Sequence, residues 1–595
     1  MNLAAGARRP SRAALPFAVL MLLCAALFLY RLGRPALGDP DEGRNAEVAR
    51  EMLTTGDWLT PHINGARYLD KPPAFFWAVA ATFRLVGVGE LGARLPSALF
   101  AFLTVALVFF FARRHRGTRA GFLAGAIFAL CPLAIVFART VIFDMMLTFF
   151  MTLGIFAAFH AIEGDGRASL PGLIFFAAAG LGTITKGPVA LVAPLLVATA
   201  WAFATKRPGT LRRLGFGPGL LLYAAIVLPW VTFMALRNRG FLQYAVIGEN
   251  LQRMATDRFE TSQPFYWYLG IVMPGFFPWI LYAAAASGRR LRHALRAGVG
   301  DWSVADRLEP FAAIWFGALF IFFSLVHSKR PSYMLPLAVP VALLAGGLWD
   351  RLAGGAAADR DAARAGAGRK ELTIGAWLVA GVCLLLAAAF LLAGPGGLVR
   401  GISHGKYDAL LSRDRLFGLT AAGLAAAAAA IAATRRGRRP VAAFLAAAAV
   451  VGVMVPLARA AIGHVDATRA SRTISRFLAG RLASGDAVIC FDEYRPGLNF
   501  YLERPVLLVT EPGRIFTSNY IKMHLEEFQA DPGFRLIPVE RMRALLRPGQ
   551  GAYVVAPRRA YDELRSDAVV PLRIVYEDAY GAVFVADAAR PAIPG

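Results

Sequence analysis

Long apolar runs separated by short polar loops make up most of the chain. A helix needs about 20 residues to cross the hydrocarbon core of a bilayer, and most of these runs come close to that length. Because lipid offers the backbone no hydrogen-bond partners, such runs are predicted to be helices. The 13 predicted spans lie near residues 14–30, 94–112, 119–137, 142–161, 170–184, 187–204, 217–235, 265–285, 310–326, 333–350, 374–394, 417–434 and 440–458.

A further apolar segment, Ala74 to Val88, is too short for a span and begins directly after Pro72 and Pro73. The loop charges decide its place, because cytoplasmic loops carry an excess of Lys and Arg. If this segment does not cross, the N-terminal arginines and the later arginine clusters all fall on one side. Those clusters lie at residues 113–119, 206–213, 289–296, 360–370 and 435–439. The pattern therefore favours an interfacial helix at 74–88 and a C-terminus on the outer side.

The long apolar runs stop near residue 464. Short strand-like stretches then alternate with helical patterns, which is typical of a small α/β domain. The strand-like stretches are residues 487–491, 506–510, 552–556, 573–576 and 582–585. We therefore predict a mainly α membrane domain at residues 1–463, whose first outer loop at 31–93 carries interfacial helices, and an outer α/β domain at residues 464–595.

Composition places the chain among multispanning membrane proteins, because 57% of its residues are hydrophobic and only 17% are charged. The net charge of +25 comes from 64 Lys and Arg against 39 Asp and Glu. Since these cations gather in short loops, the excess follows the positive-inside rule and does not predict nucleic-acid binding. The four cysteines lack Cys-x-x-Cys spacing, and no glycine-rich nucleotide fingerprint or Walker lysine loop occurs. A structural zinc site and a nucleotide-linked donor are therefore disfavoured.

Residues that can carry chemistry gather on the outer side. The first outer loop places Asp39, Asp41, Glu42, Arg44, Asp70 and Lys71 between apolar spans. Four further outer elements add charged groups, namely Asp144, Lys186 in Thr-Lys-Gly-Pro, Arg258 in the loop before residue 265, and Lys329 and Arg330 in the turn that ends at Tyr333. Cations suit a phosphate, and a carboxylate suits proton abstraction from an acceptor. The mixture predicts one site at the outer face for a membrane-dissolved, phosphate-linked donor.

Each of these residues also has a structural interpretation. A carboxylate at the edge of a membrane helix is a functional candidate, but Asp144 is equally suited to cap its helix or to pair with Arg139. Lys71 precedes two prolines, whose rigidity suits a fixed phosphate contact, although a snorkelling lysine would look the same. Arg258 and Tyr333 have no role by loop position alone, because arginines and tyrosines are common there.

Six stretches carry a specific family pattern: Asp-Glu-Gly-Arg-Asn-Ala-Glu-Val-Ala-Arg-Glu-Met (41–52), Gly-Asp-Trp-Leu-Thr-Pro-His-Ile-Asn-Gly (56–65), Tyr-Leu-Asp-Lys-Pro-Pro (68–73), Ala-Arg-Thr-Val-Ile-Phe-Asp-Met-Met (138–146), Thr-Lys-Gly-Pro (185–188) and His-Ser-Lys-Arg-Pro-Ser-Tyr-Met-Leu-Pro (327–336). They resemble the aminoarabinose transferases, which belong with the protein mannosyltransferase-like polyprenyl-phosphate glycosyltransferases. A weaker likeness continues at residues 491–502. The resemblance implies a GT-C glycosyltransferase fold, an undecaprenyl-phosphate-linked sugar donor, and inverting transfer at the periplasmic face of the bacterial inner membrane.

By this resemblance, Asp41 is the catalytic carboxylate near the acceptor oxygen and Asp144 is the second acidic residue of the site. The donor phosphate is bound by Lys71, Arg258 and Tyr333. Further candidate substrate contacts are Glu42, Arg44, Tyr68, Asp70, Lys186 and Lys329. No cofactor is required, although Asp70 and His62 are candidates for holding a divalent cation. Asp70 replaces the usual Glu, and Asn45 stands where an aromatic residue is common, so the metal and sugar contacts of the family do not carry over directly.

The leading hypothesis is transfer of 4-amino-4-deoxy-L-arabinose, or a similar sugar, from undecaprenyl phosphate to lipid A. A second hypothesis keeps the donor but makes protein Ser/Thr or another glycan the acceptor. With a hydroxyl acceptor Asp41 would be a general base, whereas a phosphate acceptor is already ionised and Asp41 would only orient it. A transporter of the sugar lipid is disfavoured, because transporters place their polar groups near the middle of the membrane and these charges gather at one face.

Overall fold

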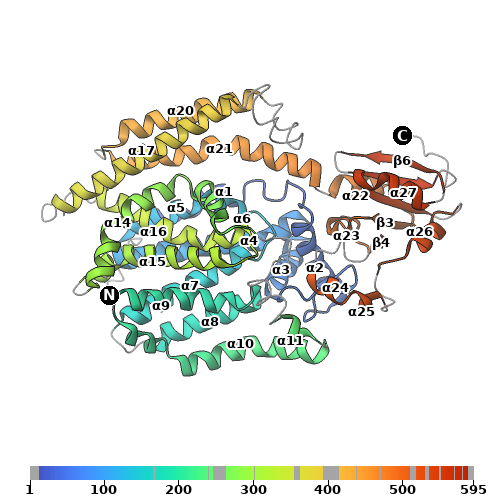
Figure 1. The fold of residues 1–595 in the computed structure, drawn as a ribbon, viewed down its shortest axis with the longest axis horizontal. Coiled ribbons are helices and arrows are strands. Elements are labelled where there is room, and N and C mark those ends of the chain that lie inside the picture. The colour runs from blue at the N-terminus through green and yellow to red at the C-terminus, as the bar shows by residue number, and fades with distance from the viewer. Residues whose placement is uncertain are drawn as a thin grey trace, which may run out of the picture.

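The structure is a computed structural model of the 595-residue chain. It describes residues 13–164, 169–238, 240–245, 263–299, 302–353, 362–392, 414–436, 439–469, 471–509, 518–529, 535–547, 551–568, 570–578 and 581–586. Helices form most of it, and a smaller α/β region built from the C-terminal residues lies at one end (Figure 1).

The membrane region is a bundle of long apolar helices (Figure 1). Its helices are α1 (Ala14–Phe28), α4 (Glu90–Arg116), α5 (Thr118–Ala129), α6 (Pro132–Ala138), α7 (Asp144–Glu163), α8 (Ser169–Lys186), α9 (Val189–Ala204), α10 (Phe216–Arg237), α13 (Leu269–Phe276), α14 (Trp279–Ala297), α15 (Val304–Leu325), α16 (Ala338–Ala353), α17 (Ala362–Leu392), α20 (Asp414–Thr434) and α21 (Pro440–Arg469). Four tryptophans are fully buried in this bundle, which identifies its packed interior.

Among the described residues, seven helices are long and apolar enough to cross a membrane, or nine if each of two bent pairs counts as one span. The bends, 69° between α5 and α6 and 110° between α13 and α14, fall at Pro132 and Pro278, which interrupt the helical hydrogen bonding. Each of the 13 predicted segments coincides with one of these helices, with a bent pair or with a shorter apolar helix. The mainly α membrane fold is therefore confirmed, while the number of spans stays a prediction.

The first outer loop has its own structure. It contains α2 (Asp41–Thr55), the short strands β1 (His62–Ile63) and β2 (Ala66–Arg67), and α3 (Ala74–Val86). Asn64 and Gly65 join the strands with φ angles of 53° and 79°, as the two central residues of a tight hairpin turn require. The predicted interfacial helix corresponds to α3, whose apolar side packs inward through Phe75, Phe76 and Val79.

The C-terminal region is a five-stranded sheet with strand order β4-β3-β5-β7-β6. Strands β3 (Ala487–Phe491), β4 (Leu507–Val509) and β5 (Ala552–Pro557) are parallel, whereas β6 (Leu572–Glu577) and β7 (Gly581–Ala586) pair antiparallel. The helices around it are α22 (Arg472–Ala479), α23 (Pro496–Leu502), α24 (Asn519–Met523), α25 (Leu525–Gln529), α26 (Val539–Leu545) and α27 (Tyr561–Ala568). This confirms a C-terminal α/β fold. The predicted boundary at residue 463 falls inside α21 and stays a prediction.

One apolar core joins the first outer loop to the C-terminal region. It includes Ala46 of α2 and Phe76 of α3 together with Leu498 and Phe500 of α23 and Tyr520 of α24. In Figure 1, α2 and α3 lie between the helical bundle and the sheet. The first outer loop therefore forms a layer between the helical bundle and the C-terminal region.

Candidate active site

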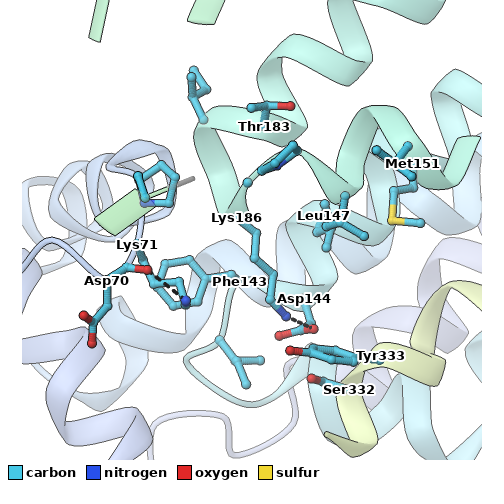
Figure 2. A pocket seen from close by; sticks show the side chains of 18 of the residues that line it. Asp70, Lys71, Phe143, Asp144, Leu147, Met151, Thr183, Lys186, Ser332 and Tyr333 are labelled. Carbon is cyan, nitrogen blue, oxygen red and sulfur yellow. Dashed lines mark hydrogen bonds and ion pairs between the residues drawn. The ribbon is translucent and has the colours of Figure 1, made fainter. Parts of the chain in front are cut away.

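A cavity of about 550 Å³ lies where the first outer loop meets the ends of the membrane helices (Figure 2). Its polar lining comes from α2, the segment between β2 and α3, α7, α8, α10 and the turn that precedes α16. These polar residues are Asp41, Arg44, Asn45, Asp70, Lys71, Asp144, Thr183, Lys186, Tyr223, Arg330, Ser332 and Tyr333. The structure thus brings together charged residues that are far apart in the sequence.

Asp144 and Lys186 form a buried ion pair in this cavity. Asp144 begins α7 and Lys186 ends α8, so the packing of these two helices places both side chains at the same end of the bundle. The side chains are only 4% and 12% exposed. The Lys186 side chain also points toward the Tyr333 ring (Figure 2), with its ammonium 4.9 Å from the ring centre. Arg139, the predicted alternative partner of Asp144, instead donates to the carbonyls of α1 and the residues after it.

Asp41 is the first residue of α2 and lies at the edge of the cavity with its side chain 47% exposed. Arg44 donates to its Oδ1 at 2.5 Å, and a guanidinium nitrogen of Arg330 is 4.0 Å from the same atom. Loss of water contacts raises the pKa of Asp41, but the positive charges of Arg44, Arg330 and Lys186 outweigh this and hold the pKa below its usual value. Asp41 is therefore ionised at neutral pH.

Arg44 is held over the face of Tyr68, with 5.9 Å from the guanidinium carbon to the ring centre. Tyr68 is 2% exposed and does not line the cavity, so it supports Arg44 from behind. Arg44 is one of three cations around Asp41, together with Arg330 and Lys186. This concentration of positive charge makes the polar end of the cavity a site for an anion.

Asp70 and Lys71 both line the cavity, but their polar atoms have different roles. The Lys71 ammonium donates to the Asp70 carbonyl at 2.8 Å, as the dashed line in Figure 2 marks. The Asp70 carboxylate accepts hydrogen bonds from the Tyr244 hydroxyl at 2.5 Å and from the backbone N–H groups of Asn519 and Tyr520 at 3.0 and 2.9 Å. In this structure, therefore, the carboxylate links the first loop to α24.

Several predicted contacts lie away from the cavity lining. Glu42 binds Arg94 and accepts hydrogen bonds from the N–H groups of Gly38 and Val141. Lys329 is 5% exposed and donates to the Val326 carbonyl. His62, in β1, is likewise absent from the lining, and no group of three or more His, Cys, Asp or Glu in the described ranges could hold a metal ion.

The predicted donor-phosphate ligand Arg258 lies outside the described residues. Arg330 is a cavity residue to which the sequence pattern gave no role, although its turn was singled out. Thr183, Tyr223 and Ser332 were also missed, because a single hydroxyl group in or beside an apolar helix gives no distinct sequence signal. Arg330 could have been found from its place directly beside Pro331, in the same turn as Tyr333.

The rest of the cavity is apolar. Its wall is made by side chains of α9, α10, α11 (Phe241–Gln243) and α15, including Val192, Val227, Leu242 and Phe322. A cluster of cations at one end and aliphatic and aromatic walls at the other match a ligand that joins a phosphate to a hydrocarbon chain. The arrangement can bind such a phosphoester and hold an ionised carboxylate next to its polar end.

Comparison with known proteins shows which proteins this chain resembles. Residues 70–233 match the family model described as dolichyl-phosphate-mannose-protein mannosyltransferase. The arabinosyl transferase of Edwardsiella ictaluri, named for undecaprenyl phosphate-α-4-amino-4-deoxy-L-arabinose, is 31% identical over 56% of this chain and 59% of its own length. The Pseudomonas aeruginosa protein of the same name is 31% identical over 56% of this chain and 59% of its own length. The chain thus spans less than two thirds of these relatives.

Solved structures extend the likeness to the whole chain. The crystal structure of ArnT from Cupriavidus metallidurans bound to undecaprenyl phosphate is 26% identical, has a TM-score of 0.74, and aligns over 97% of this chain and 99% of its own. Its apo form has a TM-score of 0.71. The chain therefore has the GT-C fold of membrane glycosyltransferases and is a multi-pass protein of the inner membrane. Within that class it is similar to the aminoarabinose transferases, which is the resemblance that the sequence motifs predicted.

Proposed function

We propose that this protein is an inverting glycosyltransferase that moves 4-amino-4-deoxy-L-arabinose from undecaprenyl phosphate to lipid A at the periplasmic face of the inner membrane. The observation that carries the proposal is the match over 97% of the chain to ArnT bound to undecaprenyl phosphate. The shape and charge of the cavity support it, because a phosphate fits among the cations and a polyprenyl chain fits along the apolar wall.

In the proposed reaction, an acceptor oxygen forms a bond to the anomeric carbon of the sugar while the bond from that carbon to the donor phosphate oxygen breaks. The electron pair of the broken bond stays with undecaprenyl phosphate, whose negative charge increases. Lys71, Arg44 and Arg330 are the cavity residues that we assign to this developing charge. Arg258, outside the described residues, is assigned to it by sequence resemblance alone. Fixed cations next to a leaving phosphate stabilise the transition state without reorganisation during the reaction.

Asp41 is assigned to the acceptor. Its lowered pKa keeps it ionised, so it can accept a proton from a hydroxyl acceptor or orient an acceptor that needs no base. A phosphate group of lipid A is already largely ionised at neutral pH, and for that acceptor Asp41 holds the nucleophile and balances the positive charge that develops on the sugar. Asp144 acts through Lys186, whose ammonium it holds beside Tyr333.

A second candidate keeps the donor and changes the acceptor to a protein hydroxyl. The family model over residues 70–233 favours it, because the description of that model names protein mannosyltransfer. For a hydroxyl acceptor, a general base is necessary, and Asp41 would fill that role.

The experiment uses the full-length protein in lipid nanodiscs with purified undecaprenyl phosphate-α-4-amino-4-deoxy-L-arabinose. Lipid A and a Ser/Thr-containing peptide are supplied in separate reactions, and the products are analysed by mass spectrometry. We expect modified lipid A with the wild type and none with Asp41→Asn. Modified peptide with unmodified lipid A would instead establish the second candidate, and release of neither product would refute both.

A further inference from the structure

The first outer loop is attached to the C-terminal region at a point two residues before Asp41. The half-buried Asp39 carboxylate accepts a hydrogen bond from the N–H of Gly497, at the start of α23, at 2.8 Å. Its other oxygen is hydrogen-bonded to the hydroxyl of the fully buried Ser471, which lies between α21 and α22. Arg495 and Glu493, on the segment between β3 and α23, are the charged groups that face Asp39. One side chain of the first outer loop, Asp39, therefore binds two separate points of the C-terminal region, Ser471 and Gly497.

Two glycines make this contact possible. A Cβ added to Gly43 of α2 would lie 2.7 Å from the backbone nitrogen of Gly497 and closer still to Asp39. A Cβ added to Gly497 would lie 2.6 and 2.9 Å from the two oxygens of Asp39. Because real Cβ atoms do not approach backbone or carboxylate atoms so closely, α2 and α23 are packed as tightly as their backbones allow. The first turn of α2, which carries Asp41, rests directly on the C-terminal region.

A second contact lies further along the loop. The buried Asn64 donates from Nδ2 to the Val506 carbonyl at 2.9 Å, and its Oδ1 accepts from the Val506 N–H at 3.0 Å. Oδ1 also accepts from Asn499 at 2.7 Å. The side chain of Asn64 therefore pairs with the residue before β4 in the way that a neighbouring strand would. This contact fixes the hairpin between α2 and α3.

The third contact is next to Lys71. The Asp70 carboxylate, in a residue that is 8% exposed, accepts the two N–H groups at the start of α24 and the hydroxyl of Tyr244. The carbonyl of the same residue accepts from the Lys71 ammonium. Asp70 is thus bound to the C-terminal region through its side chain and to a proposed phosphate ligand through its backbone.

We propose that the C-terminal α/β region positions the active site, with Asp39 holding Asp41 and Asp70 holding Lys71 through contacts to α23 and α24. The inference rests on the proposed function, because it assigns these two neighbours as acceptor and donor-phosphate residues. Asp39 and Asp70 are positioning residues in this account. A displacement of about 1 Å at a reacting group can lower a rate about a hundredfold, so such contacts matter for the rate even when the fold persists.

The test compares matched substitutions in the full-length protein. In Asp39→Asn, the amide oxygen can still accept from Gly497 and the amide nitrogen can donate to the Ser471 hydroxyl, so the contact is kept. Asp39→Ala removes it, and Ser471→Ala removes half of it. In Asp70→Asn, only one oxygen remains for three donors, and an NH₂ group meets an N–H group of α24. Tyr244→Phe removes one of these donors without changing a cavity residue.

Two readouts separate positioning from simple loss of stability. Steady-state transfer from the aminoarabinose lipid to lipid A gives kcat and KM for the donor. We expect Asp39→Ala to lower kcat by between about tenfold and a hundredfold with an unchanged KM, and Asp39→Asn to restore the wild-type rate. We expect Asp70→Asn, and more weakly Tyr244→Phe, to raise the donor KM. Hydrogen exchange of the amides at residues 42–45 should be faster than in the wild type in Asp39→Ala and unchanged in Asp39→Asn.

The proposal is overturned if Asp39→Ala and Ser471→Ala transfer sugar at the wild-type rate, or if Asp39→Asn loses as much activity as Asp39→Ala. Should Asp39→Ala fail to fold, Ser471→Ala decides the same point. A wild type that folds but does not modify lipid A refutes the proposed function only. Positioning is then decided by hydrogen exchange and by the affinity for undecaprenyl phosphate. The positioning proposal is supported if the amides near Asp41 exchange faster in Asp39→Ala and Asp70→Asn binds undecaprenyl phosphate more weakly than the wild type. It is overturned if those amides exchange at the wild-type rate.

Discussion

Breaking the ion pair between Asp144 and Lys186 should cost both stability and activity, and the two losses can be separated. Both side chains lie in the cavity lining and are nearly inaccessible to water. Asp144→Asn removes the negative charge but keeps the size of the side chain. The Lys186 ammonium is then left with a neutral partner and the Tyr333 ring.

The size of the effect follows from the burial of the pair. Removing one partner of a buried ion pair costs about 3–5 kcal/mol. The substituted amide can still accept a hydrogen bond from the ammonium, and a hydrogen bond to a charged group contributes about 1.5–3 kcal/mol. The free energy of unfolding should therefore fall by about 1–3 kcal/mol in Asp144→Asn. In Asp144→Ala, which cannot accept this hydrogen bond, it should fall by about 3–5 kcal/mol.

The assay is unfolding of the purified protein by SDS in mixed micelles, followed by far-UV circular dichroism. The double variant Asp144→Asn with Lys186→Met removes the unpaired charge, so it should recover stability to within about 1 kcal/mol of the wild type. The double variant should nevertheless be inactive in sugar transfer, because Lys186 is lost from the site. A double variant no more stable than Asp144→Asn, or a single variant as stable as the wild type, would refute the reasoning about this pair.

Three further predictions concern pH and metal ions. Arg330→Ala should raise the pKa of Asp41 and move the acidic limb of the transfer rate to higher pH, whereas Arg330→Lys should not; a pH–rate profile unchanged by Arg330→Ala would exclude that effect. Desolvation raises the pKa of Asp39 to about 6. Because the folded state then binds a proton more tightly than the unfolded state, Asp39 should make the wild type more stable as the pH falls through 6. Asp39→Asn should abolish that gain, and thermal unfolding at pH 5 and 7.5 measures it. Finally, because cations of the protein surround the phosphate site, transfer should persist in EDTA, and restoration of a lost rate by a divalent cation would show that a metal is required.

The sequence predicted the elements of this protein better than their partners. Hydrophobic runs are local signals, and each predicted span corresponds to a helix or to a bent helix pair, while the stretch 573–576 corresponds to β6 and 582–585 to β7. The ends of most elements shifted by only a few residues, because periodicity is read within a short window, whereas α14, α17 and α21 extend more than ten residues beyond the predicted spans. The bends at Pro132 and Pro278 were not predicted, although a proline that interrupts helical hydrogen bonding is the signal for them.

The partners of single charged side chains could not be predicted in the same way. Asp70 was assigned to the substrate, but its carboxylate is bound by residues of α24, about 450 positions later in the chain. Glu42 was assigned in the same way and instead binds Arg94 across the first loop. A carboxylate in a motif looks the same whether it faces a ligand or another part of the protein, because only the tertiary contact decides. Arg330 shows the opposite case, since its turn was expected at the outer face without a role for this residue, and the structure places its guanidinium 4.0 Å from Asp41.

The central claim is that an ionised carboxylate at Asp41 and a lipid phosphate meet in one cavity and transfer a sugar to lipid A. The most direct measurement is mass spectrometry of lipid A after incubation with the aminoarabinose lipid and purified protein, comparing the wild type with Asp41→Asn. The account predicts aminoarabinose-modified lipid A with the wild type only. Unmodified lipid A in both reactions, or equal modification in both, would contradict it.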